Sequence, residues 1–287
     1  MVQQAFDLGL GTTYERFALN AWLAQLIGKY DFRTVLEGPG DGMTGIPGLN
    51  SLIFGRQGVE VAVVLGDATA IELARRGWRN QGCLGRARFL CSPDGRIPVR
   101  ANQFDLVWNF NRLPFFDPRA LIAEMARVSR RYVLLFVPSR RNYGFLARRL
   151  HRWLTRQSWP YGNTDVMELG KVVDLLSELD LRVLETVLLD APWWPDIIDV
   201  SEFISDLFPF LSGLLPERCP ESAEGRGPSA YRWSPERLPY FDPETYPEVH
   251  QRIRRLFFIE RSRVHWFKRI FAHHFGVLAV KQGATDD

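Results

Sequence analysis

The sequence predicts an α/β fold, in which a doubly wound, mostly parallel sheet has helices on both faces and an insertion before its last strand. Two observations lead to this prediction. In the first half of the chain, short apolar runs alternate with amphipathic stretches, which is the order expected of strands and covering helices. The chain is also long enough for a full core, since it has 287 residues of which 46% are hydrophobic and 24% charged.

The strands are expected where apolar runs lie between turn residues. These runs are Thr34 to Glu37, Glu60 to Leu65, Ala87 to Cys91, Phe104 to Asn109, Tyr132 to Val137 and Leu181 to Leu189, with FGVLAVK as the last strand. Amphipathic periodicity predicts helices at Tyr14 to Ile27, Ala68 to Arg76, Pro118 to Val128 and Val166 to Leu179, and a long basic helix near Pro247 to His273. Pro118 suits a first helical turn, where its missing N–H costs nothing. A sheet of at least six strands follows.

The residue composition changes after Asp190, because proline, glycine and aromatic residues are frequent from there to Tyr246. This change predicts an insertion that either closes over a ligand pocket or only buries itself. We therefore divide the chain into an N-terminal helical lid (1–30), a ligand-binding core (31–190), an insertion or cap (191–272), and the last core strand with its tail (273–287).

Charge and cysteine content narrow the class of protein. The formal net charge of +3 is too small to indicate nucleic acid by itself. The three cysteines form no CxxC pair, so we expect structural thiols and no metal site. The start of the chain lacks the features of a secretory signal, which favours a cytoplasmic location. None of the five histidines lies in a motif that identifies a base, so no catalytic residue is assigned.

The stretch TVLEGPGDGMTG, Thr34 to Gly45, runs from a predicted buried strand into glycines. Such a turn lets a ligand approach bare backbone. Gly40, Gly42 and Gly45 match the GxGxxG pattern of dinucleotide sites, so a nicotinamide oxidoreductase is one interpretation. The other is S-adenosylmethionine, whose ribose and adenine need carboxylates. Asp67 and Asp94 follow the second and third predicted strands and favour the latter.

From about Thr34 to Ser139 the sequence resembles the class I S-adenosylmethionine-dependent methyltransferases of small molecules. VLEGPGDG is similar to the family's first motif, Asp67 to its second acid, Asp94 before Ile97 and Pro98 to its third, and FDLVWNF to its fourth-strand region. The resemblance implies a Rossmann-like fold, S-adenosylmethionine as cofactor and methyl transfer as activity.

The resemblance also implies the cofactor contacts. The methionine side of the cofactor would be lined by Glu37, Gly38, Pro39, Gly40 and Gly42. The ribose would contact Asp67, and the adenine would contact Pro93 and Asp94. The floor of the site would be formed by Asn109 and Phe110. Glu37 abuts Gly38, whereas the family has one residue between them, and GIPGLNS is inserted before the next helix, which Pro47 is expected to begin. This shortened motif keeps open a non-catalytic, cofactor-binding accessory protein as an alternative.

Two basic amphipathic segments stand outside these motifs. NYGFLARRLHRWLTRQ places Leu146, Leu150 and Trp153 on one helical face and arginines on the other, and VHQRIRRLFFIERSRVHWFKRIF has one acid, Glu260. The interpretation that we favour packs both apolar stripes on the sheet. Contact with an anionic membrane surface or a lipid-like acceptor is a second interpretation, and RNA methylation is a third. We expect a small, apolar or amphipathic organic acceptor.

Overall fold

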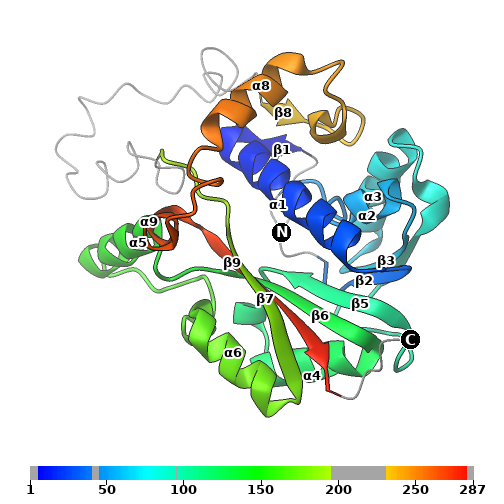
Figure 1. Ribbon diagram of the computed structural model, residues 1–287, viewed down its shortest axis with the longest axis horizontal. Helices are drawn as coiled ribbons and strands as arrows, with labels where there is room; N and C mark the ends of the chain where they lie inside the picture. Colours follow the sequence, from blue (N-terminus) through cyan, green and yellow to red (C-terminus); the bar gives the residue numbers. More distant parts are fainter. Residues whose placement is uncertain (1–5, 41–44, 95, 195–230, 283–287) are drawn as a thin grey trace.

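The sheet of this protein has seven strands, in the order β4-β3-β2-β5-β6-β9-β7. It is seen in a computed structural model that describes residues 6–40, 45–94, 96–194 and 231–282 (Figure 1). The strands are β2 (Thr34–Glu37), β3 (Glu60–Leu65), β4 (Ala87–Cys91), β5 (Phe104–Phe110), β6 (Ser129–Pro138), β7 (Leu181–Leu189) and β9 (His274–Lys281). Only β9 runs antiparallel to its two neighbours, β6 and β7. The prediction of a Rossmann-like, mostly parallel sheet is confirmed.

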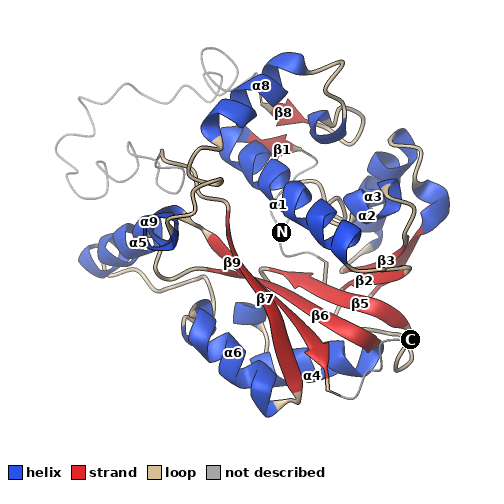
Figure 2. Ribbon diagram, in the orientation of Figure 1, coloured by secondary structure: helices blue, strands red, loops and turns tan. Residues whose placement is uncertain are grey.

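Each face of the sheet has its own core, because successive side chains of a buried strand point to opposite sides. Val35 and Val63 pack with α1 (Gly9–Lys29), α2 (Leu52–Arg56) and α3 (Ala68–Asn80). Leu36 and Val64 pack with α4 (Pro118–Val128) and α6 (Leu169–Glu178). Figure 2 shows these two layers of helices around the strands. The carboxyl ends of the parallel strands therefore meet at one edge of the sheet.

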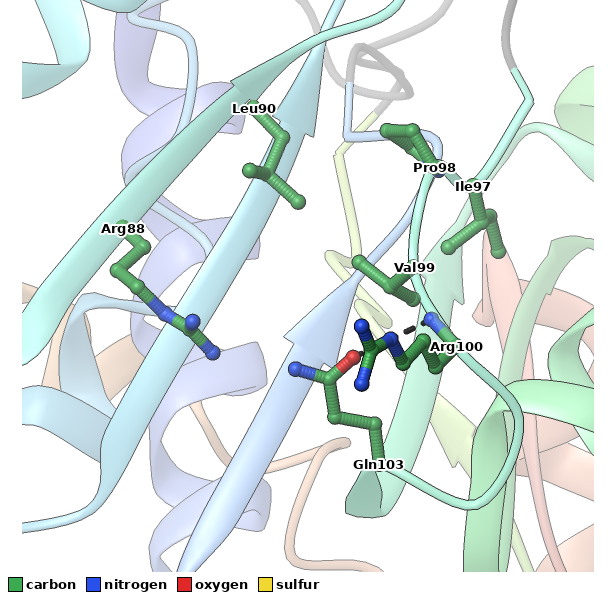
Figure 3. Close-up of a pocket in the computed structure, with 7 residues that line it drawn as sticks. All are labelled: Arg88, Leu90, Ile97, Pro98, Val99, Arg100 and Gln103. Carbon is green, nitrogen blue, oxygen red and sulfur yellow. Dashed lines mark hydrogen bonds between the residues drawn. The ribbon is translucent and has the colours of Figure 1, made fainter.

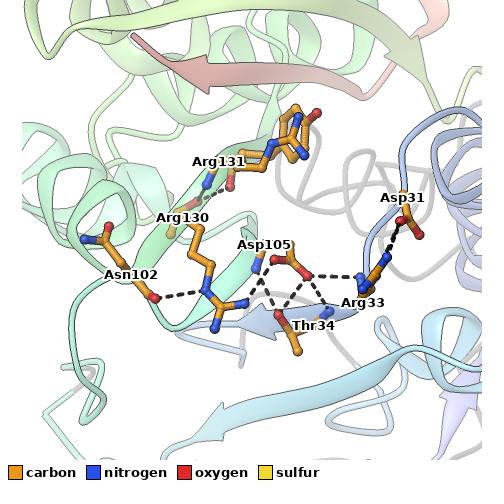
Figure 4. Close-up of polar contacts among 9 residues, drawn as sticks. Asp31, Arg33, Thr34, Asn102, Asp105, Arg130 and Arg131 are labelled. Atoms are coloured by element: carbon orange, nitrogen blue, oxygen red, sulfur yellow. Dashed lines mark hydrogen bonds and ion pairs between the residues drawn. The ribbon is translucent and has the colours of Figure 1, made fainter. Parts of the chain in front are cut away.

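Asp105 ties the start of β2 to β5 and β6 at the opposite edge (Figure 4). Its Oδ2 accepts hydrogen bonds from the amides of Arg33 and Thr34, at 3.0 and 2.8 Å, and from the Thr34 hydroxyl at 3.0 Å. Arg130 of β6 contacts its Oδ1 at 3.3 Å. Burial raises the pKa of Asp105, but these donors lower it more strongly, so the carboxylate is held ionised.

The end of the insertion packs beside the N-terminal segment. The short strands β1 (Asp7–Leu8) and β8 (Arg232–Trp233) pair antiparallel, and Trp233 Nε1 donates to the Thr13 hydroxyl at 2.8 Å. The 3-10 turn η6 (Pro239–Phe241) and α8 (Pro247–Leu256) follow. Residues 195–230, which form the middle of the predicted insertion, lie outside the described residues. The lid and cap roles of the predicted divisions remain predictions.

Three predicted elements differ from the structure. The single helix near Pro247 to His273 is wrong, because α8 is separated from α9 (His265–Phe271) by a turn. Pro47 does not begin a helix either: Gly45 and Gly48 have φ values of +99° and +70°, which exclude a helix there, and α2 begins at Leu52. The third difference is that the apolar side chains of one predicted basic helix are exposed to solvent, as described next.

The apolar stripe of α5 (Tyr143–Leu154) does not pack on the sheet, so the interpretation that we favoured is wrong for this helix. Its exposed apolar side chains are Leu146, Leu150, Trp153 and Leu154. Gly144 is its only buried residue. The helix ends up on the outside of the molecule, next to α9 (Figure 1).

Candidate functional site

Glu37, the last residue of β2, is fully buried on the α1 side of the sheet. Its carboxylate accepts hydrogen bonds from Asn50 Nδ2 at 3.1 Å and from the Ser51 hydroxyl at 2.7 Å. Ser51 also accepts from Trp108 Nε1 at 2.9 Å. The inserted residues 45–51 therefore supply the partners that keep this acid buried.

The glycine turn after β2 lies tightly against its neighbouring strands. The Gly38 amide donates to the Trp108 carbonyl at 3.0 Å, and the Gly40 amide donates to the Val64 carbonyl at 2.7 Å. A Cβ at Gly40 would lie 2.9 Å from that same carbonyl oxygen. Glycine is therefore required at Gly40 for strand packing, and these two amides are already used within the sheet. Gly42 lies outside the described residues.

Pro39 and Asn109 fix the path of the turn. Asn109 is fully buried at the end of β5, and its Nδ2 donates to the Pro39 carbonyl at 2.9 Å, while its Oδ1 accepts from the Arg112 amide at 3.1 Å. The Gly38–Pro39 peptide bond is cis. Phe110, next in sequence, is also buried. The predicted floor and the predicted methionine-side turn are therefore in direct contact.

Asp67 and Asp94 lie at the ends of β3 and β4, which are neighbouring strands. Asp67 is exposed and caps α3, its Oδ1 accepting from the Ala70 amide at 2.8 Å. Asp94, beside the exposed Pro93, accepts from the Ser92 hydroxyl at 2.8 Å and lies 3.2 Å from Arg96. The Ser92 hydrogen bond and the Arg96 amide lower the pKa of Asp94. Both carboxylates lie at one edge of the sheet, and their oxygens can accept hydrogen bonds from ribose hydroxyls and an adenine amino group.

A buried polar network connects this edge to α1. Arg16 donates through Nε to Asp7 Oδ2 at 2.8 Å and through Nη2 to Asp7 Oδ1 at 3.0 Å. Its Nη1 contacts Asn50 Oδ1, and Asn50 in turn donates to Glu37. Tyr240 donates to Asp7 Oδ2 at 2.6 Å. No sequence motif predicts this network, because its members come from β1, α1, β2, the segment before α2, and η6.

A second buried polar cluster lies where β7 ends and β9 begins, and we name it the β7–β9 cluster. It consists of Glu15, Asn111, Asp190, His273 and His274. His273 Nδ1 lies 2.9 Å from Asp190 Oδ2, and His274 Nδ1 lies 3.6 Å from both Asp190 Oδ2 and Glu15 Oε1. Asn111 Nδ2 is 2.9 Å from His274 Nε2.

This cluster adjoins the predicted cofactor floor, because the rings of His274 and Phe110 are 5.2 Å apart. Burial raises the pKa of Asp190. His273 and His274 have the larger, opposite effect and hold this pKa at about 2. Burial lowers the pKa of His274, so its imidazole is neutral near pH 7. No sequence motif identified these histidines, since their partners are distant in the chain.

Aromatic side chains lie near the cluster, since the Tyr14 hydroxyl donates to the carbonyl of Ala191, next to Asp190, at 3.3 Å. The Tyr14 ring packs edge-on against Trp194 at 5.4 Å and Phe257 at 4.7 Å. The Tyr143 ring contacts Phe271 at 5.6 Å, and its hydroxyl donates to the Trp194 carbonyl at 2.8 Å. An apolar wall therefore stands beside buried polar groups, which is the usual lining of a small-molecule pocket.

A different cavity, of about 620 Å³, opens on the sheet face opposite α1 (Figure 3). It lies against the edge strand β4, with Arg88 and Leu90 on one side and Val99 and Gln103 on the other. Arg88 and Leu90 belong to β4 and the other lining residues to the segment between β4 and β5, whereas the strand-end residues Asp67 and Asn109 do not line the cavity. We therefore do not identify it with the predicted cofactor site.

Comparison with known proteins is consistent with this geometry. A family model described as a methyltransferase domain matches residues 44–137. No curated protein matches the chain. Among solved structures, magnesium protoporphyrin IX methyltransferase from Synechocystis, determined with bound S-adenosylhomocysteine, is similar at 12% identity and a TM-score of 0.51 over 64% of this chain and 82% of that one.

Two longer structural matches are weaker. The [4+2]-cyclase SpnF has 14% identity and a TM-score of 0.49, covering 93% of this chain and 82% of its own. Geranyl diphosphate C-methyltransferase from Streptomyces coelicolor has 12% identity and a TM-score of 0.46, covering 91% and 79%. Within the described ranges, no helix has the length and apolar character needed to cross a membrane. Residues 44–137 therefore match a methyltransferase domain, and they lie within a Rossmann-like, mostly parallel sheet.

Proposed function

We propose that this domain transfers the methyl group of S-adenosylmethionine to a small, amphipathic organic acceptor. The observation that carries the proposal is the convergence at one edge of the sheet. Asp67 and Asn109 end two of the parallel strands, and the β7–β9 cluster with its aromatic wall lies next to Phe110. Methyl transfer is an in-line displacement, so holding an acceptor close and dry supplies much of the acceleration.

Each residue has a definite task in this proposal. The sulfonium of the bound cofactor supplies the methyl group. Gly38 and Gly40 have no side chain, so the cofactor can approach the backbone of the turn closely. The Asp67 carboxylate accepts hydrogen bonds from the ribose hydroxyls. Asn109 and Phe110 form the floor, and the wall around Tyr14 and Trp194 excludes water from the acceptor.

Calorimetric titration with S-adenosylmethionine and S-adenosylhomocysteine tests the cofactor site. The variant is Asp67→Ser, because serine also caps a helix and removes only the charge. Asp117→Ser is its matched control, since Asp117 caps α4 in the same way, accepting from the Ala120 amide at 2.7 Å. Loss of hydrogen bonds to a charged group predicts roughly 10- to 100-fold weaker binding for Asp67→Ser, and wild-type affinity for Asp117→Ser.

Two outcomes would reject this assignment. Equal affinity of the Asp67→Ser and Asp117→Ser proteins would remove Asp67 from the site. Binding of NAD(H) by the wild-type protein, without binding of either sulfur compound, would favour the oxidoreductase interpretation instead.

We further propose that the acceptor is reached at an anionic membrane surface, through a region that we name the α5/α9 patch. It consists of the exposed apolar side chains Leu146, Leu150, Trp153, Leu154, Trp266 and Ile270. Trp153 is 73% exposed and Trp266 is 70% exposed. Large aromatic side chains exposed on two neighbouring helices are unusual on a soluble surface, and they suit the boundary between lipid head groups and acyl chains.

The charge around the patch favours anionic lipid. The sequence of α5 contains no acid, and the exposed Arg149 and Arg156 flank its apolar residues. Glu260 is the only acid between 257 and 273, and it pairs with Lys268 at 3.0 Å. Beside the patch, a groove of about 450 Å³ is lined by Arg149, Arg152 and Trp159. Two guanidinium groups beside indoles suit a phosphate head group.

Vesicle flotation tests this surface. We expect the protein to bind vesicles of phosphatidylcholine mixed with phosphatidylglycerol, to bind pure phosphatidylcholine weakly, and to dissociate as salt rises. Trp153→Ser should lower partitioning roughly tenfold, because insertion of a large apolar side chain is worth about 1.5 kcal/mol or more. The control is Phe115→Ser, which removes a half-exposed aromatic residue outside the patch.

The proposal fails if Trp153→Ser and Phe115→Ser bind vesicles equally. Self-association of the wild-type protein that Trp153→Ser abolishes would assign the patch to a second copy of the chain. Salt-sensitive binding of RNA, without binding to vesicles, would favour the RNA interpretation.

A further inference from the structure

The β7–β9 cluster brings three metal-ligating side chains together from distant parts of the chain. Glu15 lies on α1, Asp190 directly follows β7, and His274 begins β9. One ligand atom from each lies within 4.8 Å of the other two. The three side chains are largely buried, with exposed fractions of 14%, 5% and 10%. We propose that Glu15, Asp190 and His274 bind one divalent transition-metal ion, with Zn²⁺ or Mn²⁺ as the occupant.

The distances suit a shared cation better than direct hydrogen bonds. His274 Nδ1 is 3.6 Å from both Glu15 Oε1 and Asp190 Oδ2, which is beyond the usual range for a hydrogen bond to nitrogen. Ligands held at roughly 2.0 to 2.2 Å from one metal ion lie about 3.0 to 3.5 Å apart. Small side-chain movements would therefore complete the site.

The surroundings of His274 provide the second partner that metal-bound histidines need. A ligating imidazole donates its other N–H to an oxygen. Asn111 faces His274 Nε2 at 2.9 Å, and Asn111 Oδ1 is buried without a hydrogen-bond partner among the described residues. Turning the Asn111 amide places Oδ1 against Nε2–H, which leaves the Nδ1 lone pair directed at the two carboxylates. His273, bonded to Asp190, orients that carboxylate in turn.

The ligand set indicates the metal and its use. Two carboxylates and one imidazole suit borderline and hard divalent ions such as Zn²⁺ and Mn²⁺. Three protein ligands leave a position for an oxygen of another molecule. Since His274 adjoins Phe110, that oxygen would belong to the acceptor, and this last step rests on the proposed function. The metal would then hold the acceptor oxygen and make its hydroxyl more acidic.

Calorimetric titration of the full-length, EDTA-treated protein with ZnCl₂ and with MnCl₂ tests the site without cofactor or acceptor. We expect one ion per chain and a rise in melting temperature with added metal. Glu15→Gln keeps the shape of the side chain and should weaken binding at least about tenfold, as should His274→Gln. His265→Ala, which removes an exposed histidine, should bind as the wild type does.

The proposal is overturned if neither ion binds saturably, or if Glu15→Gln and His274→Gln bind metal as His265→Ala does. Circular dichroism of each variant verifies that it is folded, and Co²⁺ absorption of the wild-type protein reports nitrogen and oxygen ligation independently of the variants. Because no methyl transfer is measured, failure of the proposed function would leave these results unchanged.

Discussion

Replacing Arg16 with methionine is expected to destabilise the protein strongly while keeping a side chain of similar length. Arg16 is 2% exposed and Asp7 is fully buried. The substitution removes both Arg16 hydrogen bonds to Asp7, and it also removes the donors to Asn50 Oδ1 and the Ile46 carbonyl. A buried carboxylate then remains without its counter-charge.

Removing one partner of a buried ion pair costs about 3–5 kcal/mol. Asp7 would keep two donors, the Tyr240 hydroxyl at 2.6 Å and the Ile46 amide at 2.8 Å. We therefore expect the loss near the lower end, about 3 kcal/mol, which is still a large fraction of a typical folding free energy of about 5–15 kcal/mol. The double variant Asp7→Asn, Arg16→Met should recover part of this loss, because the uncompensated charge is gone.

Urea denaturation followed by tryptophan fluorescence measures the free energy of unfolding. The control is Arg33→Met, which breaks the exposed pair with Asp31, where both side chains are at least 80% exposed; a change of about 1 kcal/mol or less is expected there. If Arg16→Met lost no more than Arg33→Met, the buried pair would contribute nothing and the reasoning would be refuted. Because Asn50 also holds Glu37, weaker S-adenosylmethionine binding should accompany the loss.

Three further predictions concern the sheet and the outer helices. Gly40→Ala should destabilise the protein by about 1–3 kcal/mol, because its Cβ would lie 2.9 Å from a β3 carbonyl oxygen. Gly85→Ala is the control and should not destabilise the protein, since a Cβ there has open space around it. Equal urea midpoints for the two variants would contradict this prediction. The lowered pKa of Asp105 means that its stabilisation is complete above its unfolded pKa of about 3.9 and is lost as pH falls through the folded value. The unfolding free energy of Asp105→Asn should therefore depend less on pH between about 5 and 3 than that of the wild type, and parallel curves would count against it. Asn142 caps α5 and donates to the Phe271 carbonyl of α9 at 2.7 Å. Asn142→Ala should therefore lower the free energy of unfolding by about 1–2 kcal/mol and weaken vesicle binding. Unchanged flotation would show that the α5 cap does not support the α5/α9 patch.

Most of the sheet could be predicted from the sequence, because a buried parallel strand must be apolar on both faces. The bounds of β2, β3, β4 and β7 match the predicted ranges. The start of α1 could not be predicted in the same way. Its first turn has no capping side chain, and two glycines lie within its first three residues; pairing of β1 with β8 and packing of α1 on the sheet stabilise a start that local signals do not favour.

Positions in the candidate site were predictable only where residues lie at or just after the ends of strands. Asp67, Asp94 and Asn109 could be placed because the strand ends could be placed. Glu15 and His274 could not, since their proximity depends on how α1 and β9 cross the sheet. Helical periodicity likewise showed which α5 residues share a face, but whether that face meets the core or the solvent is decided by tertiary structure.

The position of β9 has a consequence for how the chain assembles during synthesis. β9 lies between β6 and β7 but is the last strand to leave the ribosome. Until Lys281 has emerged, β7 has no strand to pair with and β6 has one bare edge among the described strands. The nascent chain therefore exposes unpaired edges of β6 and β7 until β9 is made, and the sheet is complete only then.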